Sequence, residues 1–94
     1  PGQKITYVTD VAYTAENAGK IVELSGGSDY LFIETPFLEE DAEIAARKCH
    51  LTARQAGILA RRAGVKRLVT FHFSPRYQER AAQLRQEALA AFAA

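Results

Sequence analysis

The sequence has one cysteine, no tryptophan and no methionine among its 94 residues. A single thiol, Cys49, forms no disulfide within the chain and no multi-thiolate metal site. There is no apolar run of transmembrane length and no signal-peptide pattern, so we expect a cytoplasmic protein without a membrane anchor. The missing methionine, with Pro1-Gly2 leading straight into a strand-like segment, fits either loss of an initiator methionine or excision from a longer chain.

The chain also lacks an excess of either positive or negative charge. Twelve basic and eleven acidic residues give a formal net charge of +1, so the whole chain offers no reason to expect a polyanionic partner. Any case for nucleic-acid binding therefore depends on local clusters. Hydrophobic residues make up 48% and charged residues 24%, as in a soluble globular chain, and the length suits one domain spanning residues 1–94.

Hydrophobic patterning predicts three strands and four helices. Strands are expected at residues 4–9, 30–33 and 67–73, which are rich in β-branched, aromatic and other apolar residues. A helix over residues 15–24 is capped by Thr14, and the next follows Pro36, with acidic residues 39–41 at its front and a basic pair at its back. Thr52 and Gln55 form a capping box for a third helix that Gly64 ends.

The last helix follows Ser74-Pro75, a cap followed by proline at the first helical position, and buries an apolar stripe that includes Leu84 and Ala88. The order β-α-β-α-α-β-α predicts an α/β fold whose parallel strands are joined by right-handed crossovers. The continuous apolar run 30–33 is typical of a strand covered by helices on both faces. Since three strands make a thin core, we expect something further to cover or extend the sheet.

Polar residues fall at the predicted carboxyl ends of all three strands, namely Asp10, Glu34 and His72. Ligands gather at this edge of a parallel sheet, and His50, just before the Thr52 cap, could reach it. Carboxylate with imidazole suits zinc, manganese or iron. Each residue alone also fits a structural role as a turn, a strand end, a core histidine or a helix cap. Two metal ligands are fewer than the four that zinc takes, so the spacing alone indicates a partial site.

Residues 50–77, HLTARQAGILARRAGVKRLVTFHFSPRY, resemble a segment of ribonuclease Z and its relatives, hydrolases of the metallo-β-lactamase fold. That segment reads His-Ser-Thr-Ala-Arg-Glu-Ala, then Ala-Gly-Val-Lys-Arg-Leu, then Thr-His-Phe-Ser-x-Arg-Tyr. Residues 9–11 resemble the Gly-Asp-Thr strand end of the family, and residues 32–37 resemble its His-Glu-Ala-Thr-Phe stretch. The resemblance covers nearly the whole chain and implies that it is the C-terminal half of an αββα sandwich.

The resemblance also implies roles for single residues. Asp10 falls on an aspartate that bridges two metal ions, and His72 falls on a histidine that binds one of them. His50 matches a histidine associated with the scissile phosphate and the leaving group, and Glu34 matches a glutamate that orients it. Ser74 and Arg76 belong to the Ser-Pro-Arg-Tyr stretch and are expected to contact substrate. The implied cofactor is a divalent metal, with two zinc ions favoured in the complete enzyme.

The sequence departs from the family in two ways. Ile33 stands where the family has a leading histidine, Thr35-Pro36 replace Ala-Thr, and Val11 replaces threonine, changes that leave the expected ligands intact. The family's His-x-His-x-Asp-His motif, which supplies most of its metal ligands, is absent, since the chain has only two histidines. We therefore expect residues 1–94 alone to be inactive and to bind metal weakly.

The expected partner of the parent enzyme is RNA or another phosphodiester, and tRNA 3′ processing is one such reaction. Two alternatives stay open: hydrolysis of another ester or a small phosphodiester, and a non-catalytic α/β module that has lost its metals. Basic residues around Gly64 and along the last helix are more typical of a solvated face than of a phosphate site. Cys49 is expected to be a small buried residue beside His50. An open sheet side would favour a homo-oligomer.

Overall fold

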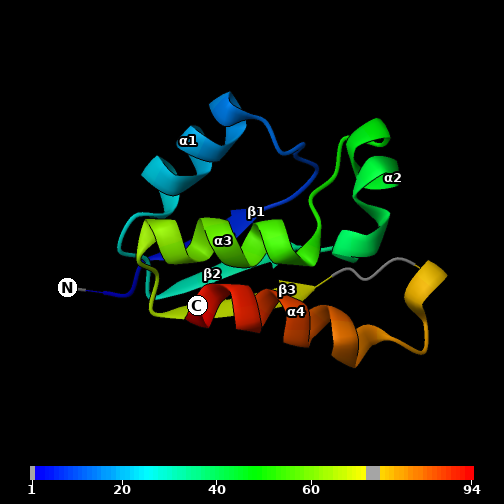
Figure 1. The fold of residues 1–94 in the computed structure, drawn as a ribbon. Coiled ribbons are helices and arrows are strands. Elements are labelled where there is room, and N and C mark those ends of the chain that lie inside the picture. The colour runs from blue at the N-terminus through cyan, green and yellow to red at the C-terminus, as the bar shows by residue number, and fades with distance from the viewer. Residues whose placement is uncertain (1, 72–74) are drawn as a thin grey trace.

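The computed structural model describes residues 2–71 and 75–94, which form a three-stranded parallel sheet with helices against it (Figure 1). The strands are β1 (Ile5–Val8), β2 (Tyr30–Glu34) and β3 (Arg67–Phe71), in the spatial order β1-β2-β3. Tyr7 lies opposite Phe32, and Phe32 lies opposite Val69. The predicted α/β class and parallel pairing are confirmed, so the carboxyl ends of the strands share one edge.

The helices largely follow their predicted signals. They are α1 (Ala15–Ser25), α2 (Ala42–Arg47), α3 (Ala53–Ala63) and α4 (Ala81–Ala93), with short 3₁₀ turns η1 (Glu39–Asp41) and η2 (Pro75–Tyr77). Thr14 caps α1 by accepting a hydrogen bond from the Asn17 backbone N–H. Thr52 and Gln55 form the predicted capping box, and Gly64 ends α3 with a φ of 68°. The prediction that the last helix begins at Pro75 is wrong, because Pro75–Tyr77 form η2 and α4 begins at Ala81 after Arg80. The predicted Ser74 cap lies outside the described residues.

The helix predicted after Pro36 differs from the structure in length. Its acidic front, residues 39–41, forms η1, and α2 has only six residues. Thr52 lies close to this turn because its hydroxyl donates a hydrogen bond to Oε1 of Glu39 at 2.7 Å. The chain therefore folds tightly here, and this folding brings the α2–α3 junction to the sheet edge.

The core lies between the sheet and the helices, with α3 at its centre (Figure 1). Leu31 and Ile33 of β2 are fully buried, and so is Leu59 of α3, which belongs to the same apolar cluster. α4 packs along α3 at Gly57, where an added Cβ would lie 2.1 Å from the carbonyl oxygen of Ala88. The absence of a side chain at Gly57 thus sets the helix–helix separation.

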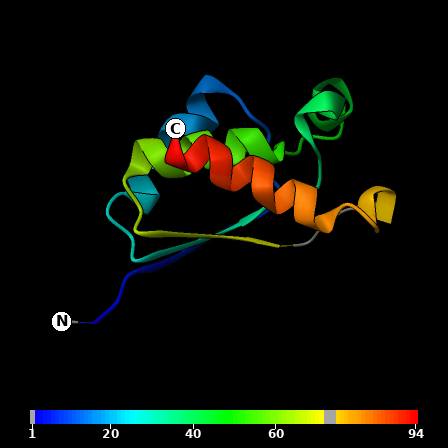
Figure 2. The ribbon, with the colours of Figure 1, turned by 60° about the horizontal axis from the view of Figure 1, so that its bottom comes forward.

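One sheet face carries the helices and the other stays open in the described part of the chain (Figure 2). Tyr7 on this open face is 66% exposed and its ring stacks on that of Phe32, with centroids 4.7 Å apart. The prediction that helices cover both faces of residues 30–33 is therefore wrong for this chain. The open face, as we call it below, consists of alternate apolar residues of the three strands: Ile5, Tyr7, Tyr30, Phe32, Val69 and Phe71.

A buried tyrosine ties the C-terminal segment to the region around α2. The Tyr77 hydroxyl donates a hydrogen bond to the Asp41 carboxylate, and its ring packs edge-on against Phe37. Burial, reinforced by this hydrogen bond, raises the pKa of Tyr77 to about 12.

No helix in the described residues is long and apolar enough to cross a bilayer.

Candidate functional site

The first candidate side chain, Asp10, follows β1 and adopts an unusual backbone conformation. Its φ is 49°, in the left-handed region that aspartate tolerates better than most residues. The Asp10 backbone N–H donates a hydrogen bond to Oε1 of Glu34 at 2.9 Å. The exposed Asp10 carboxylate is therefore held at the sheet edge by its main chain, and the side chain remains available to a ligand.

Glu34, the last residue of β2, is only 6% exposed. Burying a carboxylate is costly unless it is paired or hydrogen-bonded, so its contacts indicate what the site is built to hold. Besides the bond from Asp10, Oε1 of Glu34 lies 3.8 Å from Nδ1 of His50. Glu34 thus stands between the other two candidate residues and contacts both.

The turn that ends α2 places His50 at this edge of the sheet. Cys49 adopts a φ of 58°, and its N–H donates to the Ala46 carbonyl at 3.1 Å. The His50 N–H donates to the Ala45 carbonyl at 2.9 Å, which completes a Schellman motif with Cys49 in the position usually taken by glycine. The prediction that Cys49 is buried is wrong, because this left-handed position leaves the residue exposed.

Together, the three residues form a compact cluster. The ligating atoms of Asp10, Glu34 and His50 all lie within 4.8 Å of one another, so the convergence expected at the strand ends is observed for these three. The Nδ1 atom of His50 is buried and has no hydrogen-bond partner in the described residues. An unsatisfied buried nitrogen costs about 1–3 kcal/mol, and a proton shared with Glu34 or a bound cation would remove this cost.

The donor set suits a divalent cation. Two carboxylates and an imidazole are ligand types that zinc, manganese and iron accept. Zinc binds such atoms at about 2.0–2.2 Å in a tetrahedral arrangement, so two ligand atoms of one ion lie about 3.5 Å apart. The observed spacing of up to 4.8 Å is wider than this, so the three groups as they stand are not closed around a single ion.

The remaining predicted site residues are less fully described. His72 and Ser74 lie outside the described residues. Arg76 is exposed in η2, where its positive charge acts on the buried Tyr77. Their roles stay predictions.

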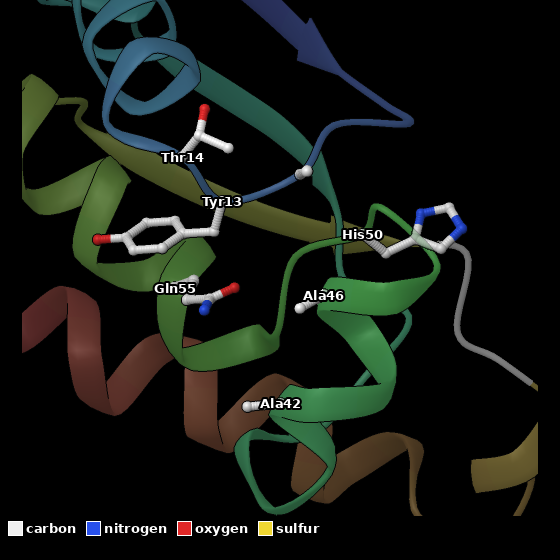
Figure 3. A pocket seen from close by; sticks show the side chains of 7 residues that line it. Tyr13, Thr14, Ala42, Ala46, His50 and Gln55 are labelled. Carbon is white, nitrogen blue, oxygen red and sulfur yellow. The ribbon is translucent and has the colours of Figure 1, made fainter.

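A pocket beside His50 was not predicted from the sequence. It has a volume of about 150 Å³ and lies between the β1–α1 connection, α2 and α3 (Figure 3). Tyr13 and Gln55 lie at one end and His50 at the other. The complete lining is Ala12, Tyr13, Thr14, Ala42, Ala46, His50 and Gln55. Small side chains spaced four apart on α2 were the available sequence signal, but alanine is common on buried helix faces too.

The sequence and the fold match a known class of proteins. The model of the β-lactamase superfamily domain matches residues 1–73, and the chain belongs to this family. The observed α/β arrangement, with helices on one face of a parallel sheet, fits part of its αββα sandwich.

Within this class, the chain is similar to ribonuclease Z. It is 47% identical to ribonuclease Z of Thermobifida fusca over 77 residues, which cover 82% of this chain and 23% of that protein. It is 40% identical to ribonuclease Z of Brevibacillus brevis over 91 residues, covering 97% of this chain and 27% of that protein. The chain thus spans about a quarter of the length of these relatives, and the resemblance found in the sequence is confirmed.

Proposed function

We propose that this chain contributes to the active site of a metal-dependent hydrolase of the ribonuclease Z type, which cleaves phosphodiester bonds in RNA. The observation that carries the proposal is the cluster of Asp10, Glu34 and His50 within 4.8 Å at the carboxyl edge of the sheet. The similarity to ribonuclease Z supports RNA as the substrate class, with tRNA 3′ processing as one candidate reaction. The single unpaired Cys49 supports a cytoplasmic location.

Asp10 and His72 are the residues that would hold the divalent metal, with two zinc ions favoured in the complete protein. A metal bound there supplies activation of water and Lewis-acid stabilisation of charge on the phosphate. The exposed carboxylate of Asp10 suits this role because its backbone alone fixes its position.

His50 would protonate the departing oxygen or stabilise charge on the phosphate. Glu34, 3.8 Å from Nδ1 of His50, would orient the imidazole. Ser74 and Arg76 would contact the phosphate.

The open face is explained by the same proposal. It carries stacked aromatic side chains that no helix covers in the described residues. Because the chain spans about a quarter of its relatives, we propose that the rest of the same polypeptide packs there as the second sheet of a sandwich, with residues 1–94 forming the C-terminal half of that domain. The isolated 94 residues would then self-associate, bind metal poorly and lack activity.

The test uses the full-length gene product with zinc and a labelled RNA carrying a 3′ extension beyond a tRNA acceptor stem. Wild type should cleave it, chelation should abolish cleavage, and His50→Ala should lower kcat about 10²- to 10⁴-fold. Arg85→Ala, on the exposed surface of α4, is the matched control and should leave kcat unchanged.

Absence of phosphodiester cleavage by the metal-loaded wild type would overturn the proposal. Hydrolysis of a carboxylic ester by that preparation would assign a different hydrolase activity to the site. Turnover of RNA by residues 1–94 alone with added metal would overturn the proposed inactivity of this piece.

A further inference from the structure

A second hollow adjoins the pocket beside His50 and shares two of its lining residues. This second hollow has a volume of about 370 Å³ and is lined by Tyr13, Thr14, Ala15, Ala18 and Arg62. Tyr13 and Thr14 line both spaces, so the Tyr13 side chain stands between the His50 end and the Arg62 end. Side by side, the two hollows extend from His50 to Arg62 in the C-terminal part of α3.

Tyr13 at the centre of this path is 40% exposed although it lies beside the core. In Figure 3 its ring extends from the β1–α1 connection to the side away from His50, near Gln55. No hydrogen bond or ring contact of Tyr13 occurs among residues 2–71 and 75–94. A planar side chain that is half exposed and unengaged offers one face to a planar ligand.

The polar groups around Tyr13 are chiefly donors. Oε1 of Gln55 already accepts from the Thr52 N–H, so the Gln55 amide nitrogen is left to donate. The Thr14 oxygen accepts from the Asn17 N–H, so its hydroxyl hydrogen is likewise available. Donors beside an aromatic ring suit the carbonyl oxygens and ring nitrogens of a nucleobase.

The second hollow carries a positive charge at its end away from His50. Arg62 is exposed, and no carboxylate pairs with it in the described part of the chain. Gln55 and Arg62 lie seven residues apart on α3, a rise of about 10 Å along the helix axis. If the reacting phosphate of an RNA chain lies at His50, the Arg62 guanidinium is placed to contact a phosphate further along that RNA.

We propose that Tyr13 is a stacking platform for an unpaired base of the RNA next to the cleaved bond, with Arg62 contacting a following phosphate. The proposal rests on the proposed function and specifies the form of its substrate, a single-stranded segment. Size supports one ring system in the first pocket, because about 150 Å³ is below the 300–1,000 Å³ typical of sites for whole drug-sized ligands. A base reaches such a ring only when it is unpaired and unstacked.

The experiment measures binding and cleavage separately in the full-length protein. A fluorescent single-stranded RNA is titrated in the presence of chelator, so that affinity is read without turnover. Tyr13→Ala should weaken binding about 5- to 100-fold, and Tyr13→Phe should retain wild-type affinity. Leu89→Ala, whose side chain is also 40% exposed but lies on α4, is the matched control and should bind as wild type.

Two further comparisons locate the contact. An RNA that lacks the base next to the scissile phosphate should bind wild type and Tyr13→Ala equally. Arg62→Ala should reduce the slope of log affinity against log salt by about 0.7, while Arg85→Ala on α4 leaves it unchanged.

Equal affinity of wild type and Tyr13→Ala for intact RNA would overturn the stacking proposal. So would an equal effect of Tyr13→Ala on the intact and the base-free RNA. If wild type cleaves RNA while these binding differences are absent, this inference fails and the proposed function stands. If the binding differences appear without any cleavage, the stacking platform stands and the proposed hydrolase function fails.

Discussion

Oε1 of Glu34 lies 3.8 Å from Nδ1 of His50, slightly too far for a hydrogen bond, while the same oxygen accepts the Asp10 N–H at 2.9 Å. One carboxylate oxygen thus connects the backbone of a candidate metal ligand with the imidazole of a candidate acid. A small inward movement of His50 would complete the pair and satisfy its buried nitrogen. Glu34 therefore couples the position of Asp10 to that of His50.

The first prediction concerns this carboxylate. Glu34→Gln in the full-length protein keeps the side-chain size but removes the carboxylate charge that faces the His50 imidazole. We expect kcat on RNA to fall about 10- to 100-fold, as for other groups that orient a functional histidine. Steady-state kinetics check this, and Glu16→Gln on the exposed face of α1 is the control. A wild-type kcat for Glu34→Gln would remove Glu34 from the mechanism.

The second prediction concerns Cys49, which takes a glycine position with a φ of 58°. Cys49→Gly should raise the free energy of unfolding by about 1 kcal/mol, because glycine adopts the left-handed conformation without strain. Cys49→Ala removes the sulfur but keeps the Cβ, so it should show no such gain. Denaturant unfolding distinguishes them, and equal stabilities of the two variants would contradict the strain argument.

The third prediction tests the closest helix packing. Gly57→Ala places a methyl group 2.1 Å from the Ala88 carbonyl oxygen, so α4 must move away from α3. We expect the free energy of unfolding to fall by about 1–3 kcal/mol. Gly19→Ala, in α1 where nothing lies within 4 Å of the new Cβ, should instead raise stability by about 0.5–1 kcal/mol. The same sign for both variants would show that packing at Gly57 is not limiting.

Local sequence signals predicted most of this fold because its caps and strands are encoded by neighbouring residues. The capping box of Thr52 and Gln55 and the stop at Gly64 appear as predicted. The exposed Cys49 could not be foreseen, since its conformation depends on α2 ending three residues before His50 and no glycine marks that end. Similarly, apolar alternation in β1 does not reveal whether a helix, a second sheet or nothing covers Tyr7.

The candidate site was predictable to a similar extent. The rule that parallel strands end at one edge predicted that Asp10 and Glu34 meet, and the turn after α2 brings in His50, which was expected to be within reach of this edge. Tyr13 was missed because the residues next to it in the sequence do not show whether its ring lies half exposed beside a pocket or buried in the core. Only the approach of α2 and α3 around it defines that pocket.

The fourth prediction concerns the open face. Residues 1–94 alone should form dimers or larger species at high concentration, because Tyr7 and its aromatic neighbours expose apolar surface. Tyr7→Lys should shift the mass measured by sedimentation toward the monomer. Leu24→Lys, which changes a 60% exposed residue of α1, is the control and should leave it unchanged. A monomeric wild-type chain at high concentration would contradict the prediction.

The last prediction uses the pH dependence of Tyr77. Burial and the hydrogen bond to Asp41 raise its pKa from 10.0 to about 12, so the folded state holds the phenol proton more tightly than the unfolded chain does. The folded state therefore disfavours the phenolate, and it loses up to ~3 kcal/mol of stability as the pH rises from about 10 through about 12. Tyr77→Phe, which cannot ionise, should lose less stability over that range.

Denaturant unfolding between pH 8 and pH 11 is the measurement, for pH values at which the protein refolds reversibly. Tyr7→Phe is the control, because Tyr7 lies on the open face and its substitution leaves the bond between Tyr77 and Asp41 intact. Parallel stability curves for wild type and Tyr77→Phe would mean that this hydroxyl does not hold η2 against the segment that carries Asp41. The attachment of the C-terminal helix would then depend on the contact between Gly57 and Ala88 and on the apolar packing of Leu84.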